Sequence, residues 1–185
     1  MNNDSRIVHS NRNYASLLCY QKAVVVYDLT YHFCERFLDK RDRTYDQMLQ
    51  AARSGKQNIV EGYIDSATSA EVSLKLYNIA RGSLAELRED YLDYMRTRAC
   101  KLWADGSEEK EAMRRVGAEH NESDFFIRIA QSRSDEVVAN MVLVLLYQAD
   151  YLLFNFITHE EQRFLAEGGF REKLYNARVK SRGNK

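Results

Sequence analysis

The sequence of 185 residues contains no proline. Proline ends or kinks a helix, because its nitrogen has no hydrogen to donate and its ring clashes with the preceding turn. A complete absence of proline therefore favours long, uninterrupted helices. A chain of this length can also bury a substantial core, so we expect a single domain that spans residues 1–185.

The spacing of the apolar residues agrees with this expectation. Apolar side chains recur every three or four positions in four stretches, which is the period of an amphipathic helix. We predict helices over residues 14–38, 44–64, 68–104 and 134–166. Short polar turns separate the first three, and this connectivity predicts an all-α fold, an up-down-up-down four-helix bundle.

Several residues mark where the predicted helices begin and end. Thr44 precedes Gln47 by three residues, and Thr68 precedes Glu71 by three, so each pair matches a capping box. We expect Gly106 to end the third helix and Ser107 to cap the next segment. Ser134 precedes two acidic residues that favour a helix N-terminus, so it is expected to begin the fourth helix.

Two segments lie outside the four predicted helices. Residues 107–133 are charge-rich with a weak apolar pattern, and we predict a helical insertion between the third and fourth helices, as two short helices or an ordered loop. Residues 170–185 follow Gly168 and Gly169 and are predicted to form a short C-terminal helix or a basic tail.

Residues 137–157 are almost entirely apolar, so a membrane span is an alternative to a buried helix. Asn140, Gln148, Asp150 and Asn155 fall inside this stretch, and charge in the middle of a span is costly in lipid. We therefore interpret the stretch as a buried core helix, and we expect no contact with a membrane.

A polar pattern lies on either side of the turn near residue 67. It reads S-x-x-x-N-I-x-E-G, from Ser54 through Asn58 and Glu61 to Gly62. After seventeen intervening residues comes A-R-G-S-x-x-E, which contains Arg81, Gly82, Ser83 and Glu86. This pairing resembles the 23S rRNA intervening-sequence protein family of bacterial four-helix bundles. The segments around 139–153 and 168–170 are also similar to the subgroup called the four-helix-bundle suffix domain.

The resemblance implies properties that the residues alone do not. Relatives in the family, and the similar accessory proteins of diversity-generating retroelements, form homopentamers, and the retroelement proteins bind nucleic acid with a reverse transcriptase. We therefore expect a homo-oligomer, a pentamer, with RNA or an RNA-handling protein as a candidate partner. Twelve tyrosines and eight phenylalanines also exceed what one bundle core readily buries, and surplus exposed apolar surface marks interfaces.

The polar motif has two interpretations. Arg81 can reach Glu61 across the turn, and such a pair would fix the register of the two helices. Alternatively, the same residues would form a polar pocket for a ligand or a reaction. Glu86, Glu89 and Asp93 continue an acidic stripe that is either a solvated face or a partner surface.

Motifs for catalysis and for metal binding are absent from the sequence. It has no G-x-S-x-G, P-loop or G-x-G-x-x-G pattern. None of the four histidines follows a glutamate by three residues, as di-metal helical bundles require. The three cysteines lack C-x-x-C spacing and are interpreted as thiols in a reducing cytoplasm. We predict neither enzymatic activity nor a cofactor or metal.

The only dense basic segment is at the C-terminus. Formal net charge is zero, which disfavours binding of nucleic acid through bulk charge. The segment is either a solvated terminus or an arm that contacts phosphates, and its candidate nucleic-acid-binding residues are Arg171, Lys173, Arg178, Lys180, Arg182 and Lys185. The first thirteen residues are polar, so we expect no signal peptide and a cytoplasmic location.

These observations lead to two functional hypotheses. The first is a non-enzymatic, self-assembling helical scaffold that binds RNA or an RNA-handling protein. The second is an enzyme or small-ligand binder that uses a polar pocket around Glu61 and Arg81.

Overall fold

The computed structural model describes residues 13–169, 172, 174–175, 178–179 and 182. The described residues form helices, turns and loops without a strand, so the predicted all-α class is confirmed. A short 3-10 helix, η1 (Tyr14–Ser16), precedes six α-helices. These are α1 (Leu18–Phe37), α2 (Arg43–Asp65), α3 (Ala70–Thr97), α4 (Glu108–Glu119), α5 (Ser123–Ala130) and α6 (Asp135–Glu167).

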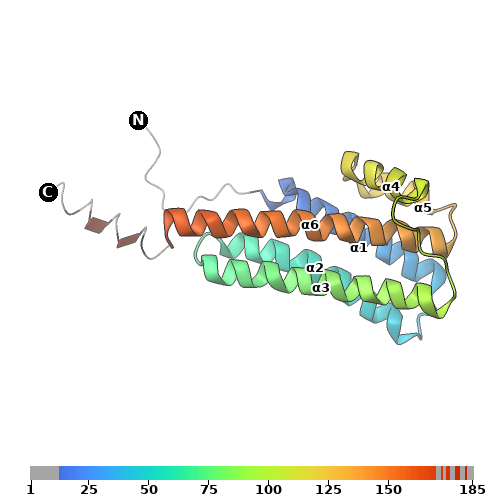
Figure 1. Cartoon of the computed structure of the whole chain (residues 1–185). Helices are drawn as coiled ribbons and strands as arrows, with labels where there is room; N and C mark the ends of the chain where they lie inside the picture. The colour runs from blue at the N-terminus through green and yellow to red at the C-terminus, as the bar shows by residue number, and fades with distance from the viewer. Residues whose placement is uncertain (1–12, 170–171, 173, 176–177, 180–181, 183–185) are drawn as a thin grey trace.

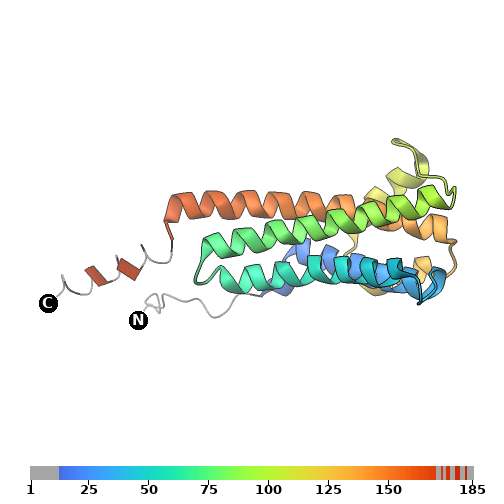
Figure 2. The same cartoon turned by 90° about the horizontal axis from the view of Figure 1, so that it is seen from below.

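The four long helices α1, α2, α3 and α6 lie side by side (Figures 1 and 2). Contacts join α1 to α2, α2 to α3, α3 to α6 and α6 back to α1. The short helices α4 and α5 lie against α6 and α1 at one end, and the C-terminal end of α6 extends past the turn between α2 and α3. Their shared apolar faces form one core, with its largest fully buried aromatic side chains at Phe33, Tyr77, Tyr91 and Phe126.

The helix starts differ in part from the predicted caps. Ser107 and Ser134 are N-caps as predicted, since their hydroxyl oxygens accept from the backbone N–H of Lys110 and Val137. The predictions for Thr44 and Thr68 are wrong. The true caps are the neighbouring residues Asp42 and Ser69, whose extended backbones turn their side-chain oxygens toward the first helical turn.

The third helix is shorter than predicted, because α3 ends at Thr97 rather than at Ala104. Ala99 has a left-handed backbone (φ +54°), and the N–H of Cys100 donates to the carbonyl of Met95 over 2.9 Å, which closes the helix end. Leu102, which lies inside the predicted third helix, is consequently outside α3 and exposed.

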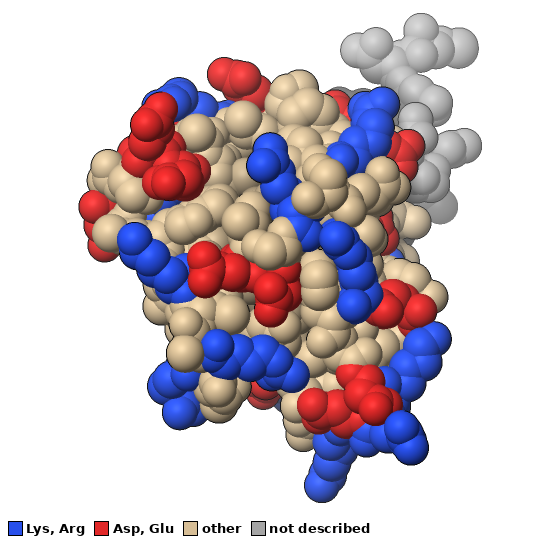
Figure 3. All heavy atoms as spheres, turned by 90° about the vertical axis from the view of Figure 1, so that its right-hand side faces the viewer, with Lys and Arg blue, Asp and Glu red and all other residues tan. Residues whose placement is uncertain are grey.

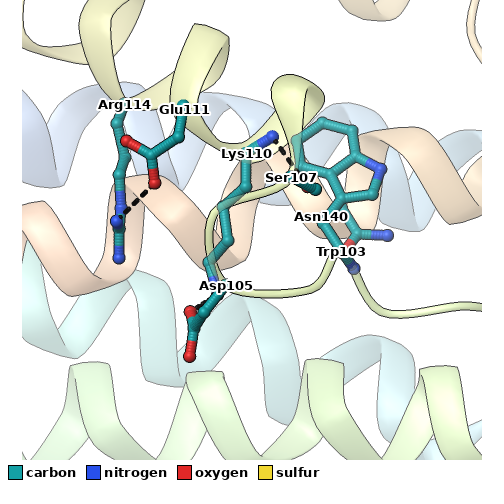
Figure 4. A network of polar contacts seen from close by, with 7 residues as sticks. All are labelled: Trp103, Asp105, Ser107, Lys110, Glu111, Arg114 and Asn140. Carbon is teal, nitrogen blue, oxygen red and sulfur yellow. Dashed lines mark hydrogen bonds and ion pairs between the residues drawn. The ribbon is translucent and has the colours of Figure 1, made fainter.

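A buried amide on α6 explains this early end. Asn140 Oδ1 accepts from the N–H of Trp103 over 2.8 Å (Figure 4). Asn140 Nδ2 donates to the carbonyl of Lys101 over 2.9 Å. Glu136 accepts from the N–H of Lys101 over 2.7 Å. The backbone of 101–103 therefore bonds to α6 and cannot continue the helix, because its polar groups already have partners.

The stretch 107–133 contains the two short helices α4 and α5. Both are tied to the long helices through backbone carbonyls at their C-terminal ends. Lys22 of α1 donates to the carbonyls of Gly117 and His120, and Arg36 of α1 donates to that of Ala130 over 2.8 Å. Cations near the C-terminus of a helix also interact favourably with its dipole.

The apolar helix α6 is long enough to cross a membrane by length and composition. In the folded chain, 61% of its most apolar window is buried against the other helices. Asn140, inside that window, is buried and bonded to the backbone of 101–103. On α3, the apolar residues Val72 and Ile79 are exposed, because the buried face of the helix lies at neighbouring positions that include Ser73 and Ala80.

Candidate functional site

The structure brings three residues of the polar motif together between α2 and α3. Ser54 Oγ lies 2.9 Å from Ser83 Oγ, and Ser83 Oγ donates to the carbonyl of Ile79 over 3.1 Å. Since a hydroxyl has a single hydrogen, Ser54 must then be the donor to Ser83. Asn58 Nδ2 donates to Ser54 Oγ over 3.2 Å and to the Ser54 carbonyl over 2.9 Å.

This chain of hydrogen bonds has a chemical consequence. Each serine hydroxyl already donates its hydrogen, and no acid or base contacts either one among the residues that the structure describes. An activated serine nucleophile needs an adjacent general base. The cluster therefore fixes α2 against α3 and is not arranged for nucleophilic chemistry.

Two glycines allow α2 and α3 to approach closely at this point. A Cβ at Gly55 would lie 2.7 Å from Leu84 Cδ2, and a Cβ at Gly62 would lie 2.7 Å from the ring of Tyr77 and 3.1 Å from the carbonyl of Ser73. These distances leave no room for a side chain. Gly62 of the motif thus has a packing role, whereas a Cβ at Gly82 would meet nothing within 4 Å.

A shallow polar groove lies beside the serine cluster. Its volume is about 480 Å³, and it is lined by Gln47, Gln50, Ala51, Ser54, Ser83, Glu86 and Asp90. Burial, together with the negative charges of Asp93 and Glu86, raises the pKa of the Asp90 carboxyl above its usual value. No group of three His, Cys, Asp or Glu side chains suited to a metal ion occurs in the described part of the chain.

The predicted pair of Glu61 and Arg81 does not form. Glu61 lies on an exposed face of α2, and Arg81 instead pairs with Asp150 of α6. Arg81 Nε lies 2.7 Å from Asp150 Oδ1, and Nη2 lies 3.3 Å from Oδ2. The reason is geometric: Arg81 is on the side of α3 that faces α6, opposite the side that contacts α2.

The pair is half-buried. The Arg81 and Asp150 side chains are 32% and 37% exposed, and the hydrogen bond that Arg81 donates to Asp150 raises the pKa of the guanidinium. Neither Glu61 nor Arg81 lines the polar groove beside the serine cluster. Of the acidic stripe, Glu89 contacts Arg88 and Asp93 contacts Arg96 at exposed positions.

A stripe of exposed aromatic residues follows the same face of α6. We call Tyr147, Tyr151 and Phe154 the aromatic stripe; they lie one turn apart and are 51%, 65% and 50% exposed. Two arginines of α3 cover its ends, with the Arg81 guanidinium 5.1 Å from the centre of the Phe154 ring and the Arg88 guanidinium 5.3 Å from that of Tyr147. Such cation–π contacts orient the rings while leaving them accessible.

Neither this stripe nor the role of Asp150 was predicted from the sequence, where Asp150 served only as evidence against a membrane span. A signal was nevertheless present: Tyr147, Asp150, Tyr151 and Phe154 follow one another at steps of three, one and three within the apolar run, which places them on one helix face.

Most of the basic C-terminal segment lies outside the described residues. Arg171, Lys173, Lys180 and Lys185 are among those not described, whereas Arg178 and Arg182 are helical and exposed.

The fold and these surfaces define an all-α protein with a closed α2–α3 seam and an exposed aromatic stripe on α6. Comparison of the chain with models of protein families, with curated proteins and with solved structures gives no match. The resemblance to the intervening-sequence family stays a prediction.

Proposed function

We propose that this protein is a non-enzymatic, self-assembling helical scaffold, folded as an up-down-up-down four-helix bundle. The cyclic order of contacts α1–α2–α3–α6 supports this topology, as does the alternating direction of the long helices in Figures 1 and 2. The insertion of α4 and α5 caps one end and leaves the C-terminal half of α6 uncovered on one side.

The aromatic stripe is the observation that carries the proposal. Three large rings on successive turns of one helix are about half exposed, and contiguous exposed apolar surface marks an interaction site. Tyr, Phe and Arg are enriched in the cores of protein interfaces. Arg81 and Arg88 flank the rings, so the stripe combines an apolar centre with charged edges.

The serine cluster supports a non-enzymatic role. The hydroxyls of Ser54 and Ser83 already donate hydrogen bonds within the fold. The carboxylates of the adjacent groove, Glu86 and Asp90, are not their acceptors. The conclusion that the protein acts by binding rests on this arrangement together with the aromatic stripe.

The occupant proposed for the stripe is a second copy of this chain, in a closed ring that the family resemblance sets at five subunits. RNA or an RNA-handling protein is the proposed client of the assembly. At the end of the molecule that carries α4 and α5, positive and negative side chains are interspersed (Figure 3). We therefore propose that phosphates bind to the C-terminal segment. In an assembly, several copies of this segment would raise its local concentration.

Light scattering during size-exclusion chromatography tests the assembly. The full chain should have a mass several times that of the 21.6 kDa subunit at micromolar concentrations, and Tyr151→Glu should reduce it to one subunit, because a charge would be buried in the interface. Ile64→Glu, at a similarly exposed apolar position on α2, is the matched control and should not change the mass. A wild-type monomer at every concentration would refute the proposal.

Filter binding with a structured RNA tests the proposed client. Affinity should fall steeply from about 50 to about 200 mM salt, because phosphate contacts release counterions. Deletion of residues 171–185 should abolish binding without changing the assembled mass. Equal binding by the truncated chain would rule out the C-terminal segment, and no binding by either at low salt would rule out the RNA client.

A further inference from the structure

A cavity of about 530 Å³ lies between α1, α4 and α6, apart from the polar motif. Cavities that bind small molecules are typically about 300–1,000 Å³ and are lined mainly by apolar side chains. The apolar lining consists of Leu18, Val144 and Leu152, and Tyr147 and Tyr151 of the aromatic stripe form its exposed edge. The size and lining therefore suit the apolar body of a small ligand.

The insertion helix α4 is held firmly over this cavity. Gly117 packs so closely on α6 that an added Cβ would lie 3.0 Å from Leu145 Cδ2. Gln148 Nε2 of α6 donates to the carbonyl of Arg114 over 2.8 Å. Lys22 joins α4 to α1 through the carbonyls of Gly117 and His120. Fixed contacts on two sides give a preformed space, which lowers the cost of ordering on binding.

The charged side chains in the lining are all positive. Lys22, Lys110 and Arg114 contribute to it, and no aspartate or glutamate does. Lys110 pairs with Asp105 over 2.6 Å and Arg114 pairs with Glu111 over 2.7 Å, both outside the lining (Figure 4). These two charges are thus balanced by carboxylates at the rim.

Lys22 differs from the other two cations. Its side chain is buried, with 1% of the residue exposed, and its ammonium group contacts two backbone carbonyls and the face of the Phe126 ring, 5.7 Å from the ring centre. Burial of a lysine without a paired charge is rare and costly. The ammonium group has three N–H donors, and the carbonyls of Gly117 and His120 use two of them. Burial also lowers the pKa of Lys22 to about 8, with the charge of Glu122 opposing the change.

We propose that this cavity binds an amphipathic carboxylate, such as a medium-chain fatty acid. The apolar chain lies between the walls formed by α1 and α6, and the carboxylate accepts the third N–H of Lys22. This occupant supplies the negative charge that the lining lacks. An amine of the same length would add a further positive charge, and an alcohol would gain no ion pair.

Isothermal titration calorimetry of the full chain with decanoate, 1-decanol and decylamine tests the ligand class. Decanoate should bind about tenfold or more tightly than 1-decanol, because a hydrogen bond to a charged group is formed only with the acid. Decylamine should bind more weakly than both. Equal affinity for all three compounds, or no binding of decanoate below its micelle concentration, would overturn the proposal.

Two variants locate the binding site. Lys22→Met should weaken decanoate binding about tenfold and leave 1-decanol binding unchanged, whereas Lys75→Met, at an exposed position on α3, should change neither. If Lys22→Met does not fold, Ala118→Trp replaces it, since Ala118 is exposed and lines the cavity. Ala118→Trp should abolish binding of both compounds. Unchanged decanoate affinity in the folded variant would place the ligand elsewhere and refute the proposed site.

Discussion

The two seams that α3 forms with its neighbours are filled in different ways. Toward α2, small residues such as Gly55 and Gly62 bring the helix backbones together, and a serine pair lies beside them. Toward α6, the long side chains of Arg81 and Arg88 reach over aromatic rings, and Arg81 pairs with Asp150.

The two seams differ in how tightly they are packed and in how much apolar surface they leave exposed. In a seam of small residues nearly every atom contacts its neighbour, so even an added methyl group must displace something. A seam covered by long charged side chains keeps apolar surface near water, since the stems cover the rings and the charges stay solvated. The first arrangement fixes α2 against α3, and the second leaves the aromatic stripe of α6 exposed.

The largest expected effect concerns the glycines. Gly62→Ala should destabilise the protein by about 1–3 kcal/mol, because the Ser73 carbonyl cannot move away from the new Cβ as a flexible side chain would. A Cβ at position 82 would meet open space. Gly82→Ala should therefore stabilise the protein by about 0.5–1 kcal/mol, because alanine favours the helix. Urea unfolding of the two variants measures both. Equal and stabilising effects would show that the α2–α3 seam is not tightly packed.

An intermediate effect is expected at the other seam. Arg81→Ala and Asp150→Ala should each destabilise by about 1 kcal/mol, as befits a half-exposed pair with two hydrogen bonds rather than a buried one. A double-mutant cycle by urea unfolding should give a coupling energy between about 0.2 and 1 kcal/mol. A second double-mutant cycle, of Arg81 with Glu61, is the control and should give no coupling energy. A measurable coupling energy there would show that the pair predicted from the sequence does form.

The smallest effect concerns the carboxyl of Asp90 in the polar groove. Its pKa is raised in the folded protein, so the folded state holds the proton more tightly than the unfolded chain. The resulting contribution to stability is fully present below the unfolded pKa, near 3.8, and is lost as pH rises through the folded value. Asp90→Asn should therefore stabilise by about 0.5 kcal/mol at pH 7, with a smaller gain toward pH 4.

Unfolding of wild type and Asp90→Asn over this pH range measures the difference. Glu89→Gln is the matched control, because Glu89 is exposed, pairs with Arg88 and is not among the charges that raise the pKa of Asp90. A gain that grows as pH falls would have the wrong sign and would mean that Asp90 is stabilised as a carboxylate.

Local signals were sufficient to predict most of the helices. Apolar periodicity identified the four long ones, and the hydroxyls of Ser107 and Ser134 identified two of the starts. Such features depend on residues within one or two turns, so the sequence can reveal them directly. The sequence places Ser54 and Ser83 in one motif but does not predict that their side chains are in contact. The structure shows that contact.

The sequence by itself determined that the chain is helical and where most helices begin, because helix hydrogen bonds and capping are local. Only the tertiary structure decided that Asn140 ends α3 early, that Arg81 pairs with a residue 69 positions away, and that Lys22 is buried beneath α4. Each depends on the rotation and axial position of one helix against another. Periodicity shows which residues share a face, and packing alone determines which neighbour that face contacts.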